Sequence, residues 1–246
     1  MLEIPMPAGQ SHDSRDAWPF FIVIDASESM TWPDENGTRP LDSAYDGLNT
    51  LLTTLEEETE ALQNTWYEVI AFAGNANVHL PLSKAEEMPE VAPLKPGTWT
   101  NYAAAWELVS ARTVEGYRRL VSDGYDVARP VIFFITDGNP GGENIEQTEA
   151  DWAHYITDMN KALGDNKAPR IITLGVGRVN REILLLLHSK RPHGAAAVAL
   201  PGYSTTSLMK SVLLQIQNSI VNSAGRGRFF WECPEGMENL CNREVH

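Results

Sequence analysis

Short runs of large apolar residues alternate along the chain with longer segments in which apolar residues recur at helical spacing. The apolar runs lie at 19–25, 67–72, 77–82, 130–136, 170–177 and 195–200. The segments with helical spacing lie at 41–55, 103–122, 152–163, 181–188 and 204–223. Runs that are apolar at successive positions are typical of strands buried on both faces, as in a parallel sheet. The pattern therefore predicts strands and helices in regular alternation.

This alternation predicts right-handed crossovers and a doubly wound α/β fold with a mainly parallel, six-stranded sheet. Gly74 and Asn75 separate the second and third strands and favour a tight hairpin, so we expect one antiparallel edge strand. In the usual strand order of such sheets the first and fourth strands are neighbours at the switch point. Ligands bind there, beyond the carboxyl ends of the strands.

Polar residues follow the first and fourth predicted strands directly. Asp25 ends the first strand, with Ser27 and Ser29 at the next alternate positions, and Asp137 ends the fourth. Side chains two apart in an extended segment point the same way, so we expect Asp25, Ser27 and Ser29 to converge. Carboxylate and hydroxyl oxygens are hard ligands, suited to magnesium, manganese or calcium and poorly suited to zinc or copper. Alternatively, such groups only satisfy backbone amides and cap a helix.

The order of these residues resembles the metal-ion-dependent adhesion site of the von Willebrand factor A domain family. The motif consists of Asp25-x-Ser27-x-Ser29, then Thr100 in a Pro/Gly-rich loop, then Thr136-Asp137-Gly138. The likeness extends over roughly residues 17 to 222. The short chain and its Asp-Ala-Ser-Glu-Ser-Met stretch also resemble the bacterial TerY/YegL type, associated with tellurite-resistance and stress gene clusters.

The resemblance implies that Ser27, Ser29 and Thr100 bind a metal ion through their hydroxyls, with Asp25 and Asp137 acting directly or through water. Thr98 is a rival for Thr100, and we prefer Thr100 because Ala103 falls where the family usually has a small residue. Neutral hydroxyls leave the ion electrophilic, and Mg²⁺ keeps exchangeable waters. An Asp or Glu from a partner protein can then replace one water, which predicts a binding module and not an enzyme.

Two other functions are compatible with the same residues. A magnesium-dependent phosphoesterase would use the ion to activate water, but no His or Lys adjoins a proposed ligand in the sequence. A haloacid-dehalogenase type of site would need an acid where Ser27 stands. The other alternative is a scaffold with a vestigial metal site. One departure from the family is Glu28, where glycine is frequent, and it adds a negative charge to the rim.

The charge and cysteine content of the chain limit the kinds of partner and the cellular location that we expect. The chain has 246 residues and a formal net charge of −14, so nucleic acid and anionic membranes are disfavoured by repulsion. Cys233 and Cys241 are its two cysteines, which favours a cytoplasmic protein without a disulfide framework. Residues 1–15 have no basic start and no apolar segment, so we expect no signal peptide. No apolar run approaches the roughly 20 residues that span a bilayer.

We expect three parts: a flexible N-terminal arm at 1–16, a von Willebrand A-like domain at 17–224 and a C-terminal tail at 225–246. The tail carries Phe229-Phe230-Trp231 between basic and acidic residues and can dock on the body or on another protein. Cys233, Cys241 and His246 lack the spacing of known zinc sites. Trp32, in the loop after the first strand, is either a rim contact for a partner or a lid, and we expect a packed lid.

Overall fold

A computed structural model of the chain describes residues 16–57, 63–142, 145–189 and 194–243. The strands of its main sheet are β1 (Asp16–Asp25), β2 (Thr65–Phe72), β3 (Ala76–Ser83), β4 (Asp126–Val127), β5 (Val131–Thr136), β8 (Arg170–Gly175), β9 (Ala195–Ala199) and β10 (Met237–Asn239). The α-helices are α1 (Pro40–Glu57), α3 (Tyr102–Ser122), α4 (Glu149–Leu163), α5 (Arg181–Leu187) and α6 (Thr205–Arg226). The short pair β6 (Gly141–Gly142) and β7 (Ile145–Glu146) forms a separate ribbon.

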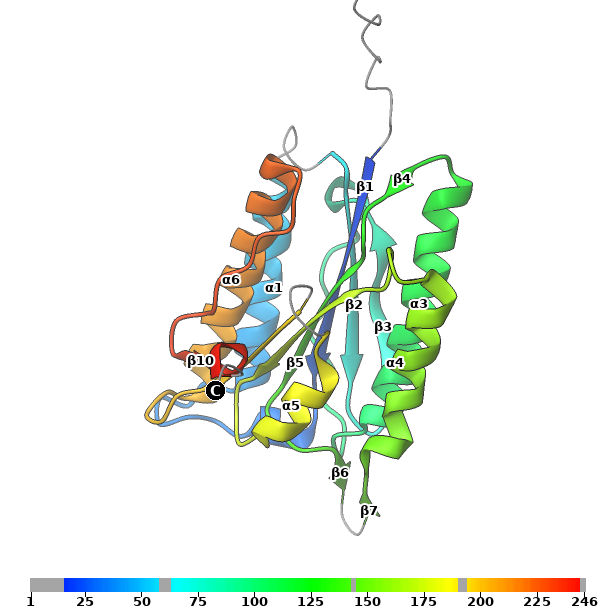
Figure 1. Cartoon of the computed structure of the whole chain (residues 1–246). Helices are drawn as coiled ribbons and strands as arrows, with labels where there is room; N and C mark the ends of the chain where they lie inside the picture. The colour runs from blue at the N-terminus through cyan, green and yellow to red at the C-terminus, as the bar shows by residue number, and fades with distance from the viewer. Residues whose placement is uncertain (1–15, 58–62, 143–144, 190–193, 244–246) are drawn as a thin grey trace, which may run out of the picture.

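The sheet lies between two helical layers, with α1 and α6 on one face and α3 and α4 on the other (Figure 1). Its strand order is β10-β9-β8-β5-β1-β2-β3, and β4 pairs with the start of β1. The central strands β2, β1, β5, β8 and β9 run parallel to one another. The predicted doubly wound α/β fold is therefore confirmed, and so is the pairing of the strands that end at Asp25 and near Asp137.

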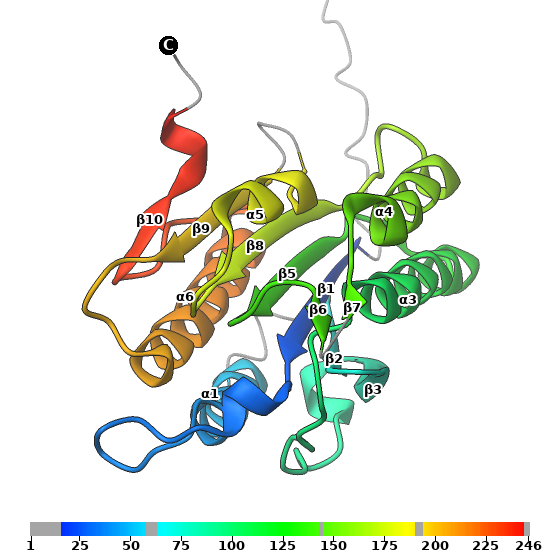
Figure 2. The same cartoon turned by 90° about the horizontal axis from the view of Figure 1, so that it is seen from below.

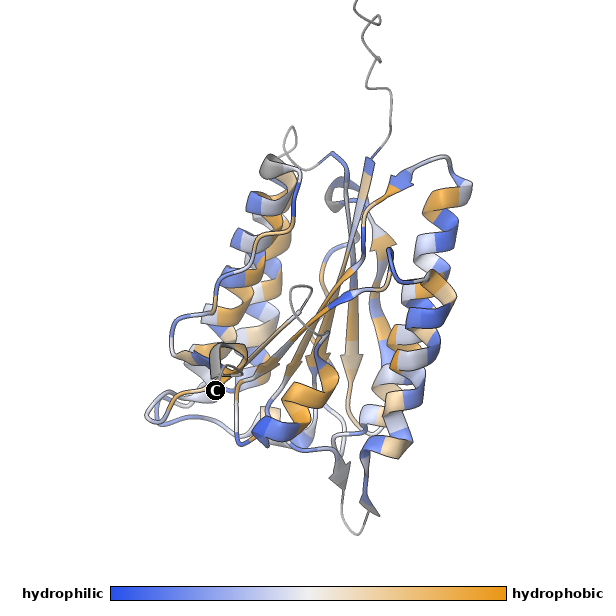
Figure 3. Cartoon of the chain, viewed as in Figure 1, coloured by the Kyte–Doolittle hydropathy of each residue, from blue (hydrophilic) through white to orange (hydrophobic). Residues whose placement is uncertain are grey.

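The continuous apolar run of β1 is explained by burial on both faces. Phe20, Ile22 and Ile24 belong to the core beneath α1 and α6, whereas Phe21 and Val23 belong to the core beneath α3 and α4. All five side chains are fully buried. Successive side chains of a strand point to opposite faces, so a strand covered on both sides needs an apolar residue at every position. Figure 3 shows the apolar strands between helices whose polar sides face outward.

The predicted count of six strands with one antiparallel edge is too low. All six predicted strands are present, and β3 is antiparallel to β2 as expected. In addition, β10 pairs antiparallel with β9 and forms the opposite edge, and the two-residue β4 pairs with β1. A strand of two or three residues is too short to show an alternating pattern, so backbone pairing to a neighbour is what defines it.

The described part of the C-terminal tail lies against the body. Trp231 packs on Phe133 of β5, with ring centroids 5.7 Å apart, and the Arg170 guanidinium lies 5.1 Å from the ring of Phe229. Cys233 and Cys241 are not joined to each other by a disulfide. His246 and all of the N-terminal arm before Asp16 lie outside the described residues. None of the described helices combines the length and apolar character needed to cross a bilayer.

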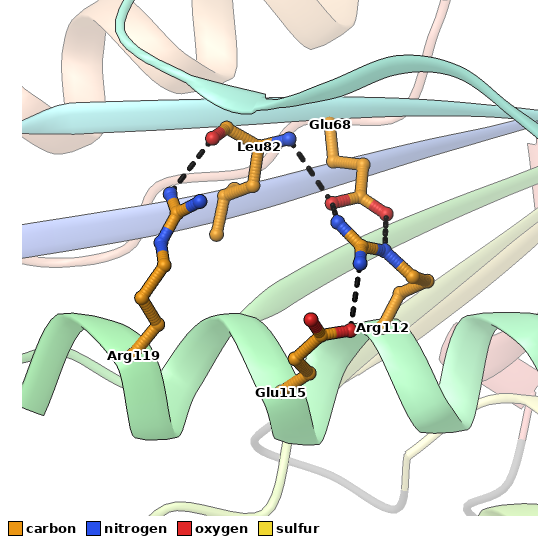
Figure 4. Close-up of polar contacts among 5 residues, drawn as sticks. All are labelled: Glu68, Leu82, Arg112, Glu115 and Arg119. Carbon is orange, nitrogen blue, oxygen red and sulfur yellow. Dashed lines mark hydrogen bonds and ion pairs between the residues drawn. The ribbon is translucent and has the colours of Figure 1, made fainter.

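One charged side chain lies inside the core beneath α3. Glu68 of β2 is fully buried, and Arg112 of α3 donates two hydrogen bonds of 2.8 and 2.9 Å to its carboxylate (Figure 4). The Leu82 amide of β3 donates a third, at 3.1 Å, where the pairing of β2 with β3 is irregular. Arg119 donates to the Leu82 carbonyl at 2.8 Å. These bonds fasten α3 to both strands.

Candidate metal centre

The turn after β1 sets the backbone of the first candidate ligands. The chain leaves β1 at Asp25 and enters a short 3-10 helix, η1 (Glu28–Thr31), in which Met30 is fully buried and anchors the turn. Ser29 therefore lies in a helical turn and not in the extended segment that the sequence suggested. The hydroxyls of Ser27 and Ser29 nevertheless lie 3.2 Å apart, because the turn brings them to the same side.

Asp137 meets these two serines from the neighbouring strand. Its Oδ1 accepts a hydrogen bond of 2.9 Å from Ser29 and one of 3.5 Å from Ser27. Two hydroxyls and one carboxylate oxygen, separated by more than 100 positions in sequence, thus form a compact group at the carboxyl edge of the sheet. Figure 2 looks onto this edge, where β1 and β5 end side by side.

Asp25 lies behind this group. One carboxylate oxygen accepts the Ser27 amide at 2.9 Å, and the other accepts the Thr136 hydroxyl at 2.7 Å. Asp25 is fully buried, while Asp137 is 8% exposed, so only Asp137 reaches the surface. The two acids differ in position: Asp137 can contact a ligand, and Asp25 holds the serine turn and Thr136 in place.

Thr100 approaches from the other side of the Asp137 loop. Its hydroxyl oxygen lies 3.2 Å from the point that a Cβ on Gly138 would occupy, so a larger residue at 138 would crowd it. A pair of 3.0 Å backbone hydrogen bonds with Gly141 fixes Thr100, and Trp99 before it adopts a positive φ of 69°. No hydrogen bond joins Thr100 to the serines or Asp137 among the described residues. Thr98 is exposed and packs toward Gly74.

Several supporting residues escaped the sequence analysis. The Tyr102 hydroxyl donates at 3.0 Å to the Gly138 carbonyl and lies 3.3 Å from the Thr136 hydroxyl. The first residue of α3 therefore supports the loop that carries Asp137. A Cβ on Gly177 would lie 2.3 Å from the Asp137 carbonyl oxygen. Because it lacks a Cβ, Gly177 lets its backbone approach that of Asp137 closely. The only sign of this role in the sequence is a glycine just after a strand.

The acids of this site lack a cationic partner. Neither Asp25 nor Asp137 forms an ion pair with any described Lys, Arg or His. Burial, reinforced by the Asp137 charge, raises the pKa of Asp25 from its ordinary value of 3.8 to about 7. Burial also raises the pKa of Asp137, against the opposing effect of its hydrogen bond from Ser29. Both carboxyls are thus held where their negative charge is poorly solvated.

The donor set fits a hard divalent cation. Hydroxyl and carboxylate oxygens are the ligands of magnesium, manganese and calcium, and a dication would supply the missing positive charge. The described residues contain no grouping of three or more His, Cys, Asp or Glu that could hold a metal ion, so a cation here depends on the hydroxyls. Asp137 and Ser29 are the partly exposed members of the group, which leaves one side of it open.

A cleft of about 850 Å³ opens beside Ser29 and Asp137. Its walls are the loop at 32–36, residues 177–178 after β8, and residues 202–207 at the start of α6. Trp32 is 63% exposed on the wall of this cleft, so the expectation of a packed lid is wrong. Met30 is the buried residue of η1, and Trp32, which follows the helix, stays outside the core.

Comparison with known proteins shows a likeness over the part of the chain that carries the candidate site. The family model of the von Willebrand factor type A domain matches residues 20–139, a stretch that contains all five candidate ligand positions. This part of the chain is therefore similar to von Willebrand factor type A domains. A search of curated proteins finds no match to the chain.

Solved structures share the von Willebrand A fold across most of the chain. The proximal thread matrix protein 1 of the mussel byssus, solved with a zinc-occupied MIDAS motif, is 13% identical and has a TM-score of 0.55 over 84% of this chain and 48% of its own. The pilus adhesin SpaC of Lactobacillus rhamnosus GG is 12% identical, with a TM-score of 0.58 over 86% of this chain and 31% of its own.

The ArnB paralog VWA2 of Sulfolobus acidocaldarius is 17% identical, with a TM-score of 0.50 over 82% of this chain and 46% of its own. At these identities the likeness shows the fold alone. The chain spans about half the length of the mussel protein. The MIDAS motif of that protein holds zinc, although hard oxygen ligands suit magnesium, manganese or calcium better.

Proposed function

We propose that this chain is a protein-binding module that uses a divalent cation, Mg²⁺ by preference, to capture an Asp or Glu side chain of a partner protein. Ser27, Ser29 and Thr100 would hold the ion through hydroxyls and Asp137 through its carboxylate, with Asp25 bound through water or orienting the serines. The ion supplies positive charge at a site that otherwise has none, and its exchangeable position takes the partner's carboxylate.

One observation carries the proposal: two buried or nearly buried carboxylates meet a set of hydroxyls at an open edge of the sheet, with no described cation to neutralise them. Buried charges in proteins are ordinarily paired or coordinate metals. The choice of a binding module over a phosphoesterase rests on the surroundings. No described His, Lys or Arg forms an ion pair with either acid, so no side chain stands ready as acid or base beside the ion.

The resemblance to the TerY/YegL type supports a cytoplasmic, bacterial stress-response or signalling assembly as the setting, with tellurite resistance as its best-known example. The same proposal keeps the division into an arm at 1–16, a domain at 17–224 and a tail at 225–246. The alternative of a scaffold that binds through its tail has less support, because Phe229 and Trp231 pack against the body.

Ion binding is tested by titrating Mg²⁺ into the full chain in a calorimeter. We expect Ser29→Ala and Thr100→Ala to lose binding, because each removes a hydroxyl ligand. The Thr98→Ala variant is the matched control, since Thr98 is the exposed threonine of the same loop. Unchanged affinity in Thr100→Ala together with lost affinity in Thr98→Ala would assign the ligand to Thr98 instead.

The open coordination position is tested with Mn²⁺ in place of Mg²⁺, by measuring the relaxation of water protons. A bound ion with an exchangeable water enhances relaxation, and acetate, used as a simple carboxylate, should reduce the enhancement by displacing that water. Enhancement that acetate leaves unchanged would contradict capture of a carboxylate. Magnesium-dependent hydrolysis of p-nitrophenyl phosphate that disappears in Thr100→Ala would instead support the phosphoesterase.

A further inference from the structure

The cleft beside the metal centre has walls of a particular composition. Seven large hydrophobic side chains are exposed among the described residues, and the two aromatic ones, Trp32 and Tyr203, both line this cleft. They are 63% and 48% exposed. Arg178 is the one basic residue among the described residues that line it, and no hydrogen bond or ion pair occupies it. Trp, Tyr and Arg are the residue types that contribute most to binding energy in protein interfaces.

These walls are fixed in place by the surrounding backbone. In the loop that carries Trp32, the Asp34 carboxylate accepts the amides of Asn36 and Thr38 at 2.9 and 3.0 Å. The Thr206 hydroxyl of α6 then donates to the Thr38 carbonyl at 3.3 Å. The loop is therefore closed on itself and fastened to α6, so Trp32 is presented on a structured segment.

The opposite wall is supported in the same way. A Cβ on Gly236 would lie 2.6 Å from the Tyr203 ring, so the ring rests directly on the backbone that leads into β10. The Asn180 amide donates at 2.6 Å to the side chain of Asn139, which ties the segment that contains Arg178 to the Asp137 loop. A partner that binds here meets rigid contacts, which lowers the conformational entropy lost on binding.

Charge indicates what the cleft selects. The chain carries a net charge of −14, and Glu28, Asp34 and Glu35 lie on or near this rim, so Arg178 is the lining side chain that attracts an acidic group. Among the described residues that line the cleft, Arg178 is therefore the one that can pair with a second carboxylate. Exposed aromatic rings bind apolar side chains best, since burying two such faces removes apolar area from water on both molecules.

We propose that the cleft selects partners by the residues next to their metal-binding acid. A large apolar side chain of the partner, aromatic by preference, packs against Trp32 and Tyr203, and a second carboxylate pairs with Arg178. This inference rests on the proposed function, because the metal-bound acid brings the segment to the cleft. The partner is thus a protein segment with two acidic residues and a neighbouring aromatic or large aliphatic residue.

Selection from a library of random linear peptides displayed on phage tests this specificity. The full chain is immobilised in Mg²⁺ and bound clones are eluted with a chelator. We expect the eluted clones to contain Asp or Glu together with an aromatic or large aliphatic residue nearby, enriched above the starting library. Chelator-eluted clones with acids but without that enrichment would overturn the cleft inference and leave the metal-dependent function standing.

Affinity measurements on a selected peptide, by fluorescence polarisation, separate the contributions. Trp32→Ala and Tyr203→Ala should each weaken binding about tenfold or more. Leu214→Ala is the matched control, because Leu214 is a comparably exposed apolar side chain outside the cleft, and it should leave affinity unchanged. If Trp32→Ala, Tyr203→Ala and Leu214→Ala all bind the peptide with equal affinity, the aromatic pair has no role. Titration of each variant with Mg²⁺ shows whether its metal centre is intact.

Arg178→Ala should weaken the same peptide, and replacing the peptide's second acid by its amide should remove that difference. Arg118→Ala, at an exposed position of α3 outside the cleft, is the control. If Arg178→Ala weakens binding of the amide-substituted peptide as much as it weakens binding of the original peptide, Arg178 does not pair with the second acid.

The two proposals fail in different ways. Clones that the chelator does not release are eluted afterwards with acid. If such clones lose affinity on Trp32→Ala but keep it on Thr100→Ala, the metal-bridged function is overturned and the cleft is retained as a binding surface. The Asp25→Ala variant, immobilised in the same way, gives the background of the selection. If the wild type yields no clones above this background, both proposals are contradicted.

Discussion

Two buried carboxylate sites of this molecule solve the same electrostatic problem differently. Glu68 is fully buried, and the chain itself supplies a cation, with both Arg112 bonds at 2.9 Å or less. Asp25 is equally buried, yet its bonds come from the neutral Ser27 amide and Thr136 hydroxyl. The first arrangement is complete and lies between α3 and the sheet. The second lacks positive charge and opens, through Asp137, onto a cleft.

This difference separates a structural site from the proposed binding site. A buried charge costs several kcal/mol unless it is paired and hydrogen-bonded, so Glu68 fastens α3 only because Arg112 is present. At Asp25 and Asp137 the cost remains in the folded chain, and a ligand of positive charge would relieve it. The position of the second site, at the carboxyl ends of two adjacent parallel strands, is where α/β sheets bind ligands.

The largest expected effect is the pH dependence of the uncompensated site. With a chelator present, the stability of the wild type relative to Asp25→Asn should fall as pH rises from about 4 to about 7. The pKa of Asp25 is raised to about 7 in the folded chain, so the folded state binds more protons than the unfolded state in that range, and stability decreases with pH. The full difference is about 4 kcal/mol. Urea unfolding measures it, and a pH-independent difference would contradict it.

The second prediction concerns the loss of the cation from the Glu68–Arg112 pair. Arg112→Ala should lower the free energy of unfolding by about 3 kcal/mol, because Glu68 is left buried without its cation. Arg118→Ala, at an exposed position of the same helix, should change stability by less than about 0.5 kcal/mol. Chemical denaturation measures both. If the two variants are equally stable, Glu68 is solvated or protonated at little cost, and the contrast between the two sites disappears.

The third prediction concerns the ion, which should stabilise only the open site. Mg²⁺ at about a hundred times its dissociation constant should stabilise the folded wild type by about 2.7 kcal/mol. Ser29→Ala should lose this gain, whereas Arg112→Ala, though less stable, should keep it because its metal centre is intact. Thermal unfolding with and without Mg²⁺ measures the shift. A shift that persists in Ser29→Ala would indicate nonspecific binding by the acidic surface.

The smallest expected effect comes from the support behind the open site. Tyr102→Phe removes the hydroxyl that donates to the Gly138 carbonyl, and we expect a loss of about 1 kcal/mol in stability with a weaker affinity for Mg²⁺. Tyr117→Phe is the control, since the Tyr117 hydroxyl makes no hydrogen bond among the described residues. If stability falls without any change in ion affinity, Tyr102 supports the fold but does not position the metal loop.

The fold was largely predictable from sequence because a strand covered on both faces requires an unbroken apolar run. The runs that end at Asp25 and Asp137 meet this condition, and they are adjacent in the sheet as expected. Strands β4 and β10 escaped prediction because segments of two or three residues carry no periodic signal. The exposure of Trp32 was not predicted because it depends on how the chain leaves η1, where Met30 is the buried residue.

The sequence by itself determined the alternation of strands and helices and the positions of the acids and hydroxyls in the motif. Both follow from local rules, namely the two periodicities of side-chain direction and the place where an apolar strand ends. Only the tertiary structure decided which carboxylate finds a cation. Glu68 meets Arg112 across 44 positions of sequence. Asp25 instead accepts from the Thr136 hydroxyl and Asp137 from the Ser29 hydroxyl, and neither acid meets a described positive charge. The physical reason is that charge compensation acts over a few ångströms of space, a distance that sequence separation does not encode.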